Sequence, residues 1–183
     1  MKILNVVLTD ALILQPKVLQ DDRGYFYESF NTQRFEDLVG NKVTFVQDNQ
    51  SRSSKGTLRG LHFQKGDAAQ AKLVRVIKGS VYDVAVDLRP HSPTFKQWYG
   101  IELTEDNHLQ FFIPRGFAHA FVALEDNTVF QYKVDNYYSS VNDGGVIWND
   151  EELAIIWPEI KLELSEKDEN LSRLSQLNLK TLW

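Results

Sequence analysis

The sequence predicts an all-β fold of the sandwich or jelly-roll type, with a few short peripheral helices. Short apolar runs recur along the chain and are separated by glycine or proline. Residues 81–88 alternate between two faces, and few stretches have helical spacing. Many short strands joined by such turns are typical of a jelly roll and not of a βαβ fold. With 183 residues, no internal repeat and no low-complexity linker, we expect a single domain over 1–183.

The expected strands follow the apolar runs in order. In the clearest of them, Tyr82, Val84 and Val86 share one face, and Asp83 and Ala85 share the other. The dipeptide Lys78-Gly79 separates two runs and predicts a tight hairpin turn. The runs that predict strands are 12–14, 25–27, 44–46, 73–77, 81–88, 98–103, 110–113, 121–124 and 129–134.

Two stretches predict helices. Residues 32–39 begin with polar side chains, carry Phe35, Leu38 and Val39 at helical spacing, and end before Gly40. The tail over 168–179 has leucines three residues apart and is expected to form short helical turns.

Composition excludes several classes of protein. Apolar residues make up 43% and aromatic residues 12%, as in a folded globular chain. Cysteine is absent, which excludes a disulfide framework, a thiolate nucleophile and a cysteine-ligated metal. Residues 1–10 have an apolar run too short for a signal peptide and are expected to form a strand. No window approaches the ~20 apolar residues of a membrane span, so we expect a soluble, cytoplasmic protein with no membrane partner.

Charge is distributed unevenly. The net charge of −5 argues against a nucleic-acid partner, because such proteins carry a basic face. Between Arg52 and Lys78, however, the only acidic residue is Asp67. A local positive field suits a small anionic ligand, and a solvated basic face is the alternative.

The segment 59–64 is the first candidate for chemistry. It reads Arg-Gly-Leu-His-Phe-Gln, and Lys72 follows His62 by ten residues. A packed structural histidine and a catalytic base both fit His62, because Leu61 and Phe63 flank it. If the segment is a strand, alternation turns His62 to the face opposite these two neighbours.

Other candidates are the remaining histidines, one tyrosine and one acidic turn. His91 and His108 lie in polar turns and are expected at the surface, whereas His119 lies in an apolar setting that suits either burial or a cleft. No His-x-His pattern occurs, so we expect no metal site. Tyr132 is either a sheet residue or a proton donor, and Asp168, in the polar turn 164–168, is able to orient a histidine.

Eight blocks along the chain together resemble one family, the dTDP-4-dehydrorhamnose 3,5-epimerases of the cupin (jelly-roll) superfamily. The order and number of the blocks make the resemblance specific, and it covers nearly the whole chain. The blocks are 21–30, 45–49, 59–64, 83–89, 92–95, 113–119, 147–150 and 165–168.

The resemblance implies an epimerase without metal or cofactor, acting on dTDP-4-dehydro-6-deoxy-D-glucose in the biosynthesis of dTDP-L-rhamnose for cell-surface polysaccharide such as lipopolysaccharide. It implies that His62 removes protons from C3 and C5 and that Asp168 raises its basicity. Lys72 would stabilise the enolate oxygen, and Tyr132 would return a proton on the opposite face. These residue types suit stepwise epimerisation, which needs a base, an acid and a positive charge where the oxyanion develops.

The resemblance also implies substrate-binding positions and a homodimer with exchanged N-terminal strands. Arg23 and Arg59 suit a pyrophosphate, through forked charge-assisted hydrogen bonds. Part of the set is expected to serve the partner's site, and Asp143 stands where the family more often has Glu. The binding positions are Arg23, Glu28, Gln47, Asp48, Asn49, Arg59, Lys72, His119, Asp143 and Lys167.

Alternatives remain open at this level. Relatives of this fold epimerise C3 alone or isomerise the ketone with almost the same residues. A nucleotide-sugar binding protein without turnover is a further alternative, although all four proposed catalytic residues are present. A metal-dependent cupin oxygenase is disfavoured by the missing ligand pattern.

Overall fold

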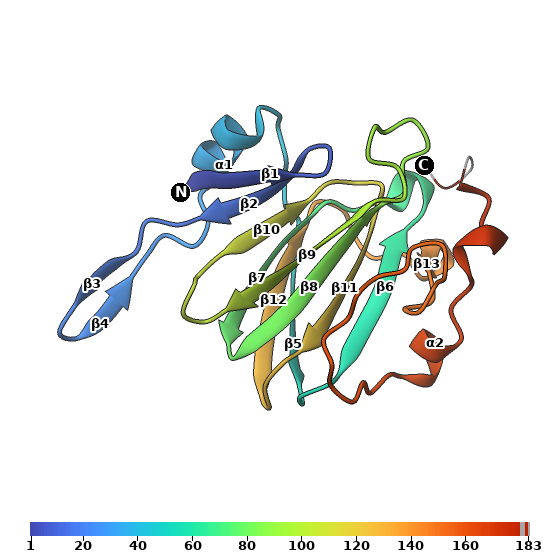
Figure 1. Cartoon of the computed structure of the whole chain (residues 1–183). Helices are drawn as coiled ribbons and strands as arrows, with labels where there is room; N and C mark the ends of the chain where they lie inside the picture. The colour runs from blue at the N-terminus through green and yellow to red at the C-terminus, as the bar shows by residue number, and fades with distance from the viewer. Residues whose placement is uncertain (180–181, 183) are drawn as a thin grey trace.

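The computed structural model describes residues 1–179 and 182, and over these residues two β-sheets face each other (Figure 1). The larger sheet has six strands, and neighbouring strands in it are antiparallel. Its order is β1 (Lys2–Val7), β2 (Ala11–Gln15), β10 (Gln110–Ile113), β7 (Lys72–Lys78), β12 (Thr128–Val134) and β5 (Gln47–Ser53).

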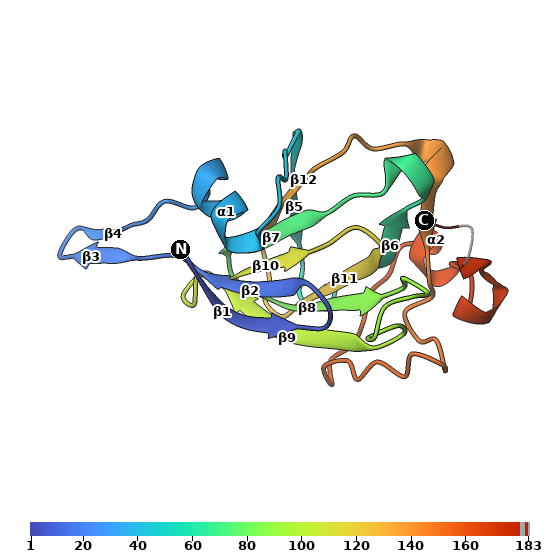
Figure 2. The same ribbon diagram turned by 90° about the horizontal axis from the view of Figure 1, so that it is seen from above.

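The smaller sheet has five strands and also pairs in antiparallel fashion. Its order is β13 (Asp143–Gly145), β6 (Leu58–Gln64), β11 (Phe117–Ala123), β8 (Ser80–Asp87) and β9 (Trp98–Thr104). A separate hairpin of β3 (Leu19–Asp21) and β4 (Gly24–Phe26) extends away from the body of the molecule in both ribbon views (Figures 1 and 2). Two sheets with few helices confirm the predicted fold class.

Alternation along β8 divides the core into two layers. Val81 and Ala85 pack between the two sheets, together with Val74, Phe111 and Phe130. The opposite face of β8 packs under the C-terminal part of the chain, which covers the outside of the smaller sheet. The β8 residues on this outer face are Tyr82, Val84 and Val86. The two faces predicted for residues 81–88 are therefore confirmed.

Helix α1 (Thr32–Val39) covers the outer face of the larger sheet, as its apolar spacing predicts. The Asn31 side chain caps it by accepting from the Arg34 N–H at 3.1 Å, and Gly40 ends it in the left-handed conformation. Phe35 is fully buried there and packs edge-on against Phe112 of β10. Burial of such a side chain stabilises the fold by about 1.5–3 kcal/mol.

The tail contains short helical turns, as expected. They are α2 (Glu166–Glu169) and the 3₁₀ turn Leu174–Gln176. Outside the tail, 3₁₀ turns lie at Gly66–Ala68 and Ser140–Asn142. No helix among the described residues is long and apolar enough to cross a membrane.

The structure corrects two local expectations. Residues 44–46 are irregular, and the strand begins only at Gln47, where the sequence is polar. The predicted hairpin at Lys78-Gly79 is also wrong, because β7 and β8 lie in different sheets. Gly79 instead turns the chain from one sheet to the other at a φ of 76°, and a Cβ there would lie 2.6 Å from Thr128 Oγ1. This corner therefore requires glycine.

Candidate active site

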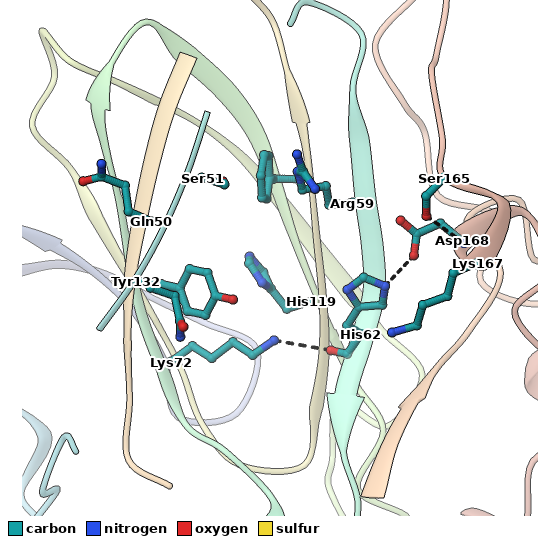
Figure 3. A pocket seen from close by; sticks show the side chains of 12 residues that line it. Gln50, Ser51, Arg59, His62, Lys72, His119, Tyr132, Ser165, Lys167 and Asp168 are labelled. Atoms are coloured by element: carbon teal, nitrogen blue, oxygen red, sulfur yellow. Dashed lines mark hydrogen bonds and ion pairs between the residues drawn. The ribbon is translucent and has the colours of Figure 1, made fainter. Parts of the chain in front are cut away.

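A cavity of about 440 Å³ opens between the two sheets and beside α2 (Figure 3). Strands β5, β7 and β12 form one wall, and β6 and β11 form the other. His62, Lys72, His119 and Tyr132 point into it from the two walls, whereas Gln50 points away from it (Figure 3). Its lining residues are Asn49, Gln50, Ser51, Arg59, His62, Lys72, His119, Phe121, Tyr132, Ser165, Lys167 and Asp168.

His62 enters the cavity from β6 and pairs with Asp168 of α2. Leu61 and Phe63 are buried on the other face of the strand, so the alternation expected for this segment is confirmed. The His62 Nε2 atom lies 2.5 Å from Asp168 Oδ1, and the His62 side chain is 31% exposed. The backbone N–H of Asp168 is in turn bonded to Ser165 Oγ at the start of α2.

The pKa of the Asp168 carboxyl indicates which partner of this pair carries the proton. Burial alone would raise the pKa of Asp168, but the hydrogen bonds from His62 and Ser165 and the charges of His62 and Lys167 lower it overall. Asp168 is therefore ionised at neutral pH and accepts from His62 Nε2–H. In the neutral ring, Nδ1 keeps its lone pair and is the basic atom.

His119 forms a second histidine–carboxylate pair in the same cavity. It lies directly opposite His62 on the neighbouring strand β11. Its Nε2 lies 3.0 and 2.9 Å from the two carboxylate oxygens of Asp83, a fully buried residue of β8. Burial lowers the pKa of His119, against the charge of Asp83 and the hydrogen bond to it. Of the two settings open to His119, the structure combines both, because the ring is buried and also lines the cavity.

Lys72 supplies a buried positive charge on the floor of the cavity. Its Nζ donates to the backbone carbonyl of His62 at 3.4 Å, and the residue is 9% exposed. Burial lowers the pKa of Lys72 to about 8, while the charges of Asp83 and Asp143 work in the opposite direction. Near neutral pH, Lys72 is therefore mostly protonated. Its ammonium is able to donate a hydrogen bond to an anion that develops in the cavity.

Tyr132 projects from β12 on the wall facing His62 (Figure 3). It lies opposite Asn49 of the edge strand β5 and Val74 of β7. Burial raises the pKa of Tyr132, against the nearby charge of Arg59. Its phenol therefore remains protonated at neutral pH and is able to act as a donor.

The expected binding residues divide into two groups. Asn49, Arg59 and Lys167 line the cavity, and Asp143 forms a close ion pair with Lys167 and a hydrogen bond with Gln64. Gln47 donates to Asn49 on the same strand.

The second group lies outside the cavity of this chain. Arg23 is in the β3–β4 hairpin with its side chain 89% exposed, paired with Asp21. Glu28 pairs with Arg34, and Asp48 pairs with Lys133 on the outer face of the larger sheet. Their binding roles stay predictions.

Four lining residues were not anticipated from the sequence: Gln50, Ser51, Phe121 and Ser165. Ser165 begins a capped helical turn, which a Ser followed by acidic residues signals. Residues 47–53 are all polar, so the sequence has no periodic signal for β5, although burial alternates along the strand and its inner face meets the cavity.

Within residues 1–179 and 182, no group of three or more His, Asp or Glu side chains has the arrangement of a metal site. Both cavity histidines use Nε2 for a carboxylate. Absence of a metal and of a cofactor stays a prediction.

Comparisons with known proteins agree on one family. A family model described as dTDP-4-dehydrorhamnose 3,5-epimerase matches residues 5–176. The enzyme of that name from Escherichia coli K12 is 54% identical over 97% of this chain and 96% of its own length. A Legionella pneumophila epimerase solved with dTDP-4-keto-L-rhamnose has a TM-score of 0.94 and 45% identity, covering 99% of this chain and 96% of that chain. A 3'-monoepimerase from Streptomyces bikiniensis, solved with dTDP-quinovose, has a TM-score of 0.87 and 29% identity, covering 99% and 88%.

Proposed function

This chain belongs to the dTDP-4-dehydrorhamnose 3,5-epimerase family, and we propose that it inverts C3 and C5 of dTDP-4-dehydro-6-deoxy-D-glucose with the cavity residues as its catalytic groups. The product would be dTDP-4-dehydro-L-rhamnose. One observation supports this function above the others: a histidine base and a tyrosine acid face each other from the two sheets, with a buried lysine between them.

In the proposed reaction, His62 Nδ1 takes the proton from C3 or C5, both of which are α to the C4 ketone. The electron pair of the broken C–H bond forms the enolate, and its oxygen accepts a hydrogen bond from Lys72 Nζ. Tyr132 then donates its phenolic proton to the opposite face of the carbon, which inverts the centre. Exchange with water removes the proton from His62 and restores the one on Tyr132.

Asp168 stabilises the imidazolium that this step creates. Its carboxylate lies 2.5 Å from His62 Nε2 and is 6% exposed, so water screens the pair weakly. Lys72 acts on the other product of the step, the enolate oxygen. A fixed charge in a water-poor cavity stabilises such an anion without reorganisation during the reaction.

Two alternatives use the same groups. Epimerisation at C3 alone needs the same base and acid, and the monoepimerase relative has this fold at 29% identity, compared with 54% for the 3,5-epimerase from E. coli. The higher identity favours inversion at both centres. A ketoisomerase, or a binding protein without turnover, would also keep the pocket.

Solvent exchange tests the proposed function. In deuterated water with dTDP-4-dehydro-6-deoxy-D-glucose, we expect NMR to locate deuterium at both C3 and C5, because each proton lost to His62 is replaced from solvent. Deuterium at C3 alone would indicate the monoepimerase. No exchange by the folded protein would contradict an enzymatic role.

Changing Tyr132 to Phe separates proton removal from proton return. The ring that packs between β5 and β7 remains, but the phenol does not. We expect hydrogen–deuterium exchange at C3 to continue with retention, while the rate of inversion falls by about 10²–10⁴. Tyr99→Phe, which removes a phenol from β9 outside the cavity, is the control. Equal loss of exchange and inversion would show that Tyr132 also takes part in deprotonation.

A homodimer would account for the binding residues that lie outside this cavity. Among the described strands, β3 and β4 pair only with each other, and their hairpin exposes Leu19, Tyr25 and Phe26 by 54%, 56% and 71%. We propose that this N-terminal hairpin is exchanged between two copies and brings Arg23, with Glu28, to the partner's cavity. A cytoplasmic location without nucleic-acid or membrane partners stays an expectation from composition.

A further inference from the structure

Ser51 has a polar atom that the fold leaves unpaired. Among the residues that the structure describes, its Oγ is the only buried side-chain nitrogen or oxygen without a hydrogen-bond partner. Nearly all buried polar groups in proteins have a hydrogen-bond partner, so a buried hydroxyl without one requires an explanation. The Ser51 residue lines the cavity, and a change of its χ1 rotamer would turn the buried hydroxyl toward a ligand bound there.

The register of β5 and β12 locates this hydroxyl along the cavity. Asn49 lies opposite Tyr132, and Ser51 lies opposite Phe130, so both face inward. Two residues further on, Ser53 Oγ accepts from Arg59 Nε at 3.3 Å. Ser51 therefore lies between the level of Tyr132 and the Arg59 guanidinium, and Figure 3 shows it on the Arg59 side of the cavity.

The surroundings indicate which part of a ligand would meet Ser51. The neighbouring wall is apolar, since Phe121 stacks on Phe130 with ring centroids 4.2 Å apart. The groups suited to the keto sugar, namely Lys72, His62 and Tyr132, lie at the other end. Arg59 is the nearest cation of the cavity on this side, and a guanidinium favours phosphate oxygens.

We propose that Ser51 Oγ donates a hydrogen bond to a phosphate oxygen of the bound nucleoside diphosphate, beside Arg59. The ligand class rests on the proposed function, whereas the unpaired hydroxyl does not. Ser51 is thus a binding residue that is unsatisfied in the free protein and satisfied in the complex. Changing Ser51 to alanine should therefore affect the free protein and the complex differently. The free protein loses an unpaired polar atom, which does not destabilise it, whereas the complex loses a hydrogen bond.

The test compares Ser51→Ala with the wild type by calorimetric titration of dTDP and by thermal unfolding without ligand. We expect dTDP to bind about 10–100-fold more weakly, the range for a hydrogen bond to a charged group. We expect the unfolding temperature to stay equal or to rise. With the dTDP-sugar as substrate, KM should rise while kcat stays near the wild-type value. Ser54→Ala, which removes an exposed hydroxyl just beyond β5, is the matched control and should change nothing.

Thymidine, which has no phosphate, distinguishes the proposed contact from a change in the shape of the wall. Its affinity should be the same for Ser51→Ala and wild type. Equal dTDP affinity, equal losses for dTDP and thymidine, or a lower unfolding temperature would each overturn the role of Ser51. If the wild-type protein does not bind dTDP, both the proposed function and the Ser51 contact are wrong. If the wild type and the variant bind dTDP equally, only the Ser51 contact is wrong.

Discussion

Changing His62 to alanine is expected to abolish exchange at both C3 and C5 while the protein stays folded. Asp168 holds His62 through Nε2, which leaves Nδ1 facing the space between the sheets, and the His62 side chain is 31% exposed to that space. His119, its neighbour across the strand pair, has its Nε2 on Asp83 and its pKa lowered by burial. Removal of one well-placed base costs about 10²–10⁴ in rate.

The fold should tolerate this change because the His62 ring packs little. Its side chain is 31% exposed, and the buried anchors of the strand are Leu61 and Phe63 on the opposite face. Circular dichroism and the unfolding temperature measure this, and His91→Ala, at an exposed turn, is the matched control. An unfolded His62→Ala protein would favour the structural interpretation of the residue, and a folded variant with normal exchange would remove His62 from the mechanism.

Patterns of buried side chains were predictable where each face of a strand meets its own core layer. Alternation in β8 satisfies this condition, because one face lies between the sheets and the other under the tail. The helix over residues 32–39 was predictable for a similar reason, since its polar cap, apolar face and terminal glycine are all local. Local signals of this kind do not depend on the rest of the chain.

The errors lie where tertiary structure decides. Strand β5 has no apolar period, because its inner face meets a polar cavity and its outer face meets solvent. The strand was therefore predicted at the neighbouring residues 44–46, which include two apolar side chains. Consecutive strands usually pair, which makes a hairpin the natural expectation at Gly79. In a two-sheet fold the same short turn also serves as a corner between sheets, and sequence does not distinguish the two.

The candidate site was predictable as a set of residue types but not as a geometry. His62 and Asp168 are 106 residues apart in sequence, and only the packing of α2 against β6 brings them together. The pairing of His119 with Asp83 gave no local signal either, because each residue sits in an ordinary alternating strand. Resemblance to a family supplied the roles, and the structure supplies the contacts by which they are proposed to operate.

Changing Lys72 to methionine is the second large effect that we expect. Methionine fills a similar volume and removes a charge whose burial is unfavourable, so the fold should stay equally stable or become more stable. The enolate oxygen would lose its donor, and loss of one such donor costs about 10²–10³ in rate. Lys78→Met is the matched control, since Lys78 lies on the same strand but is exposed.

The pH profile distinguishes this electrostatic role from a role in packing. Burial lowers the pKa of Lys72 to about 8, so the ammonium is present below that pH and is lost above it. Stabilisation of the enolate is lost with it, and kcat/KM for C3 exchange in the wild type should fall about tenfold for each pH unit above 8. In Lys72→Met this basic limb should be absent, so the two proteins should converge at high pH. A variant whose rate is low but whose basic limb is unchanged would show that a different group carries the charge that stabilises the enolate.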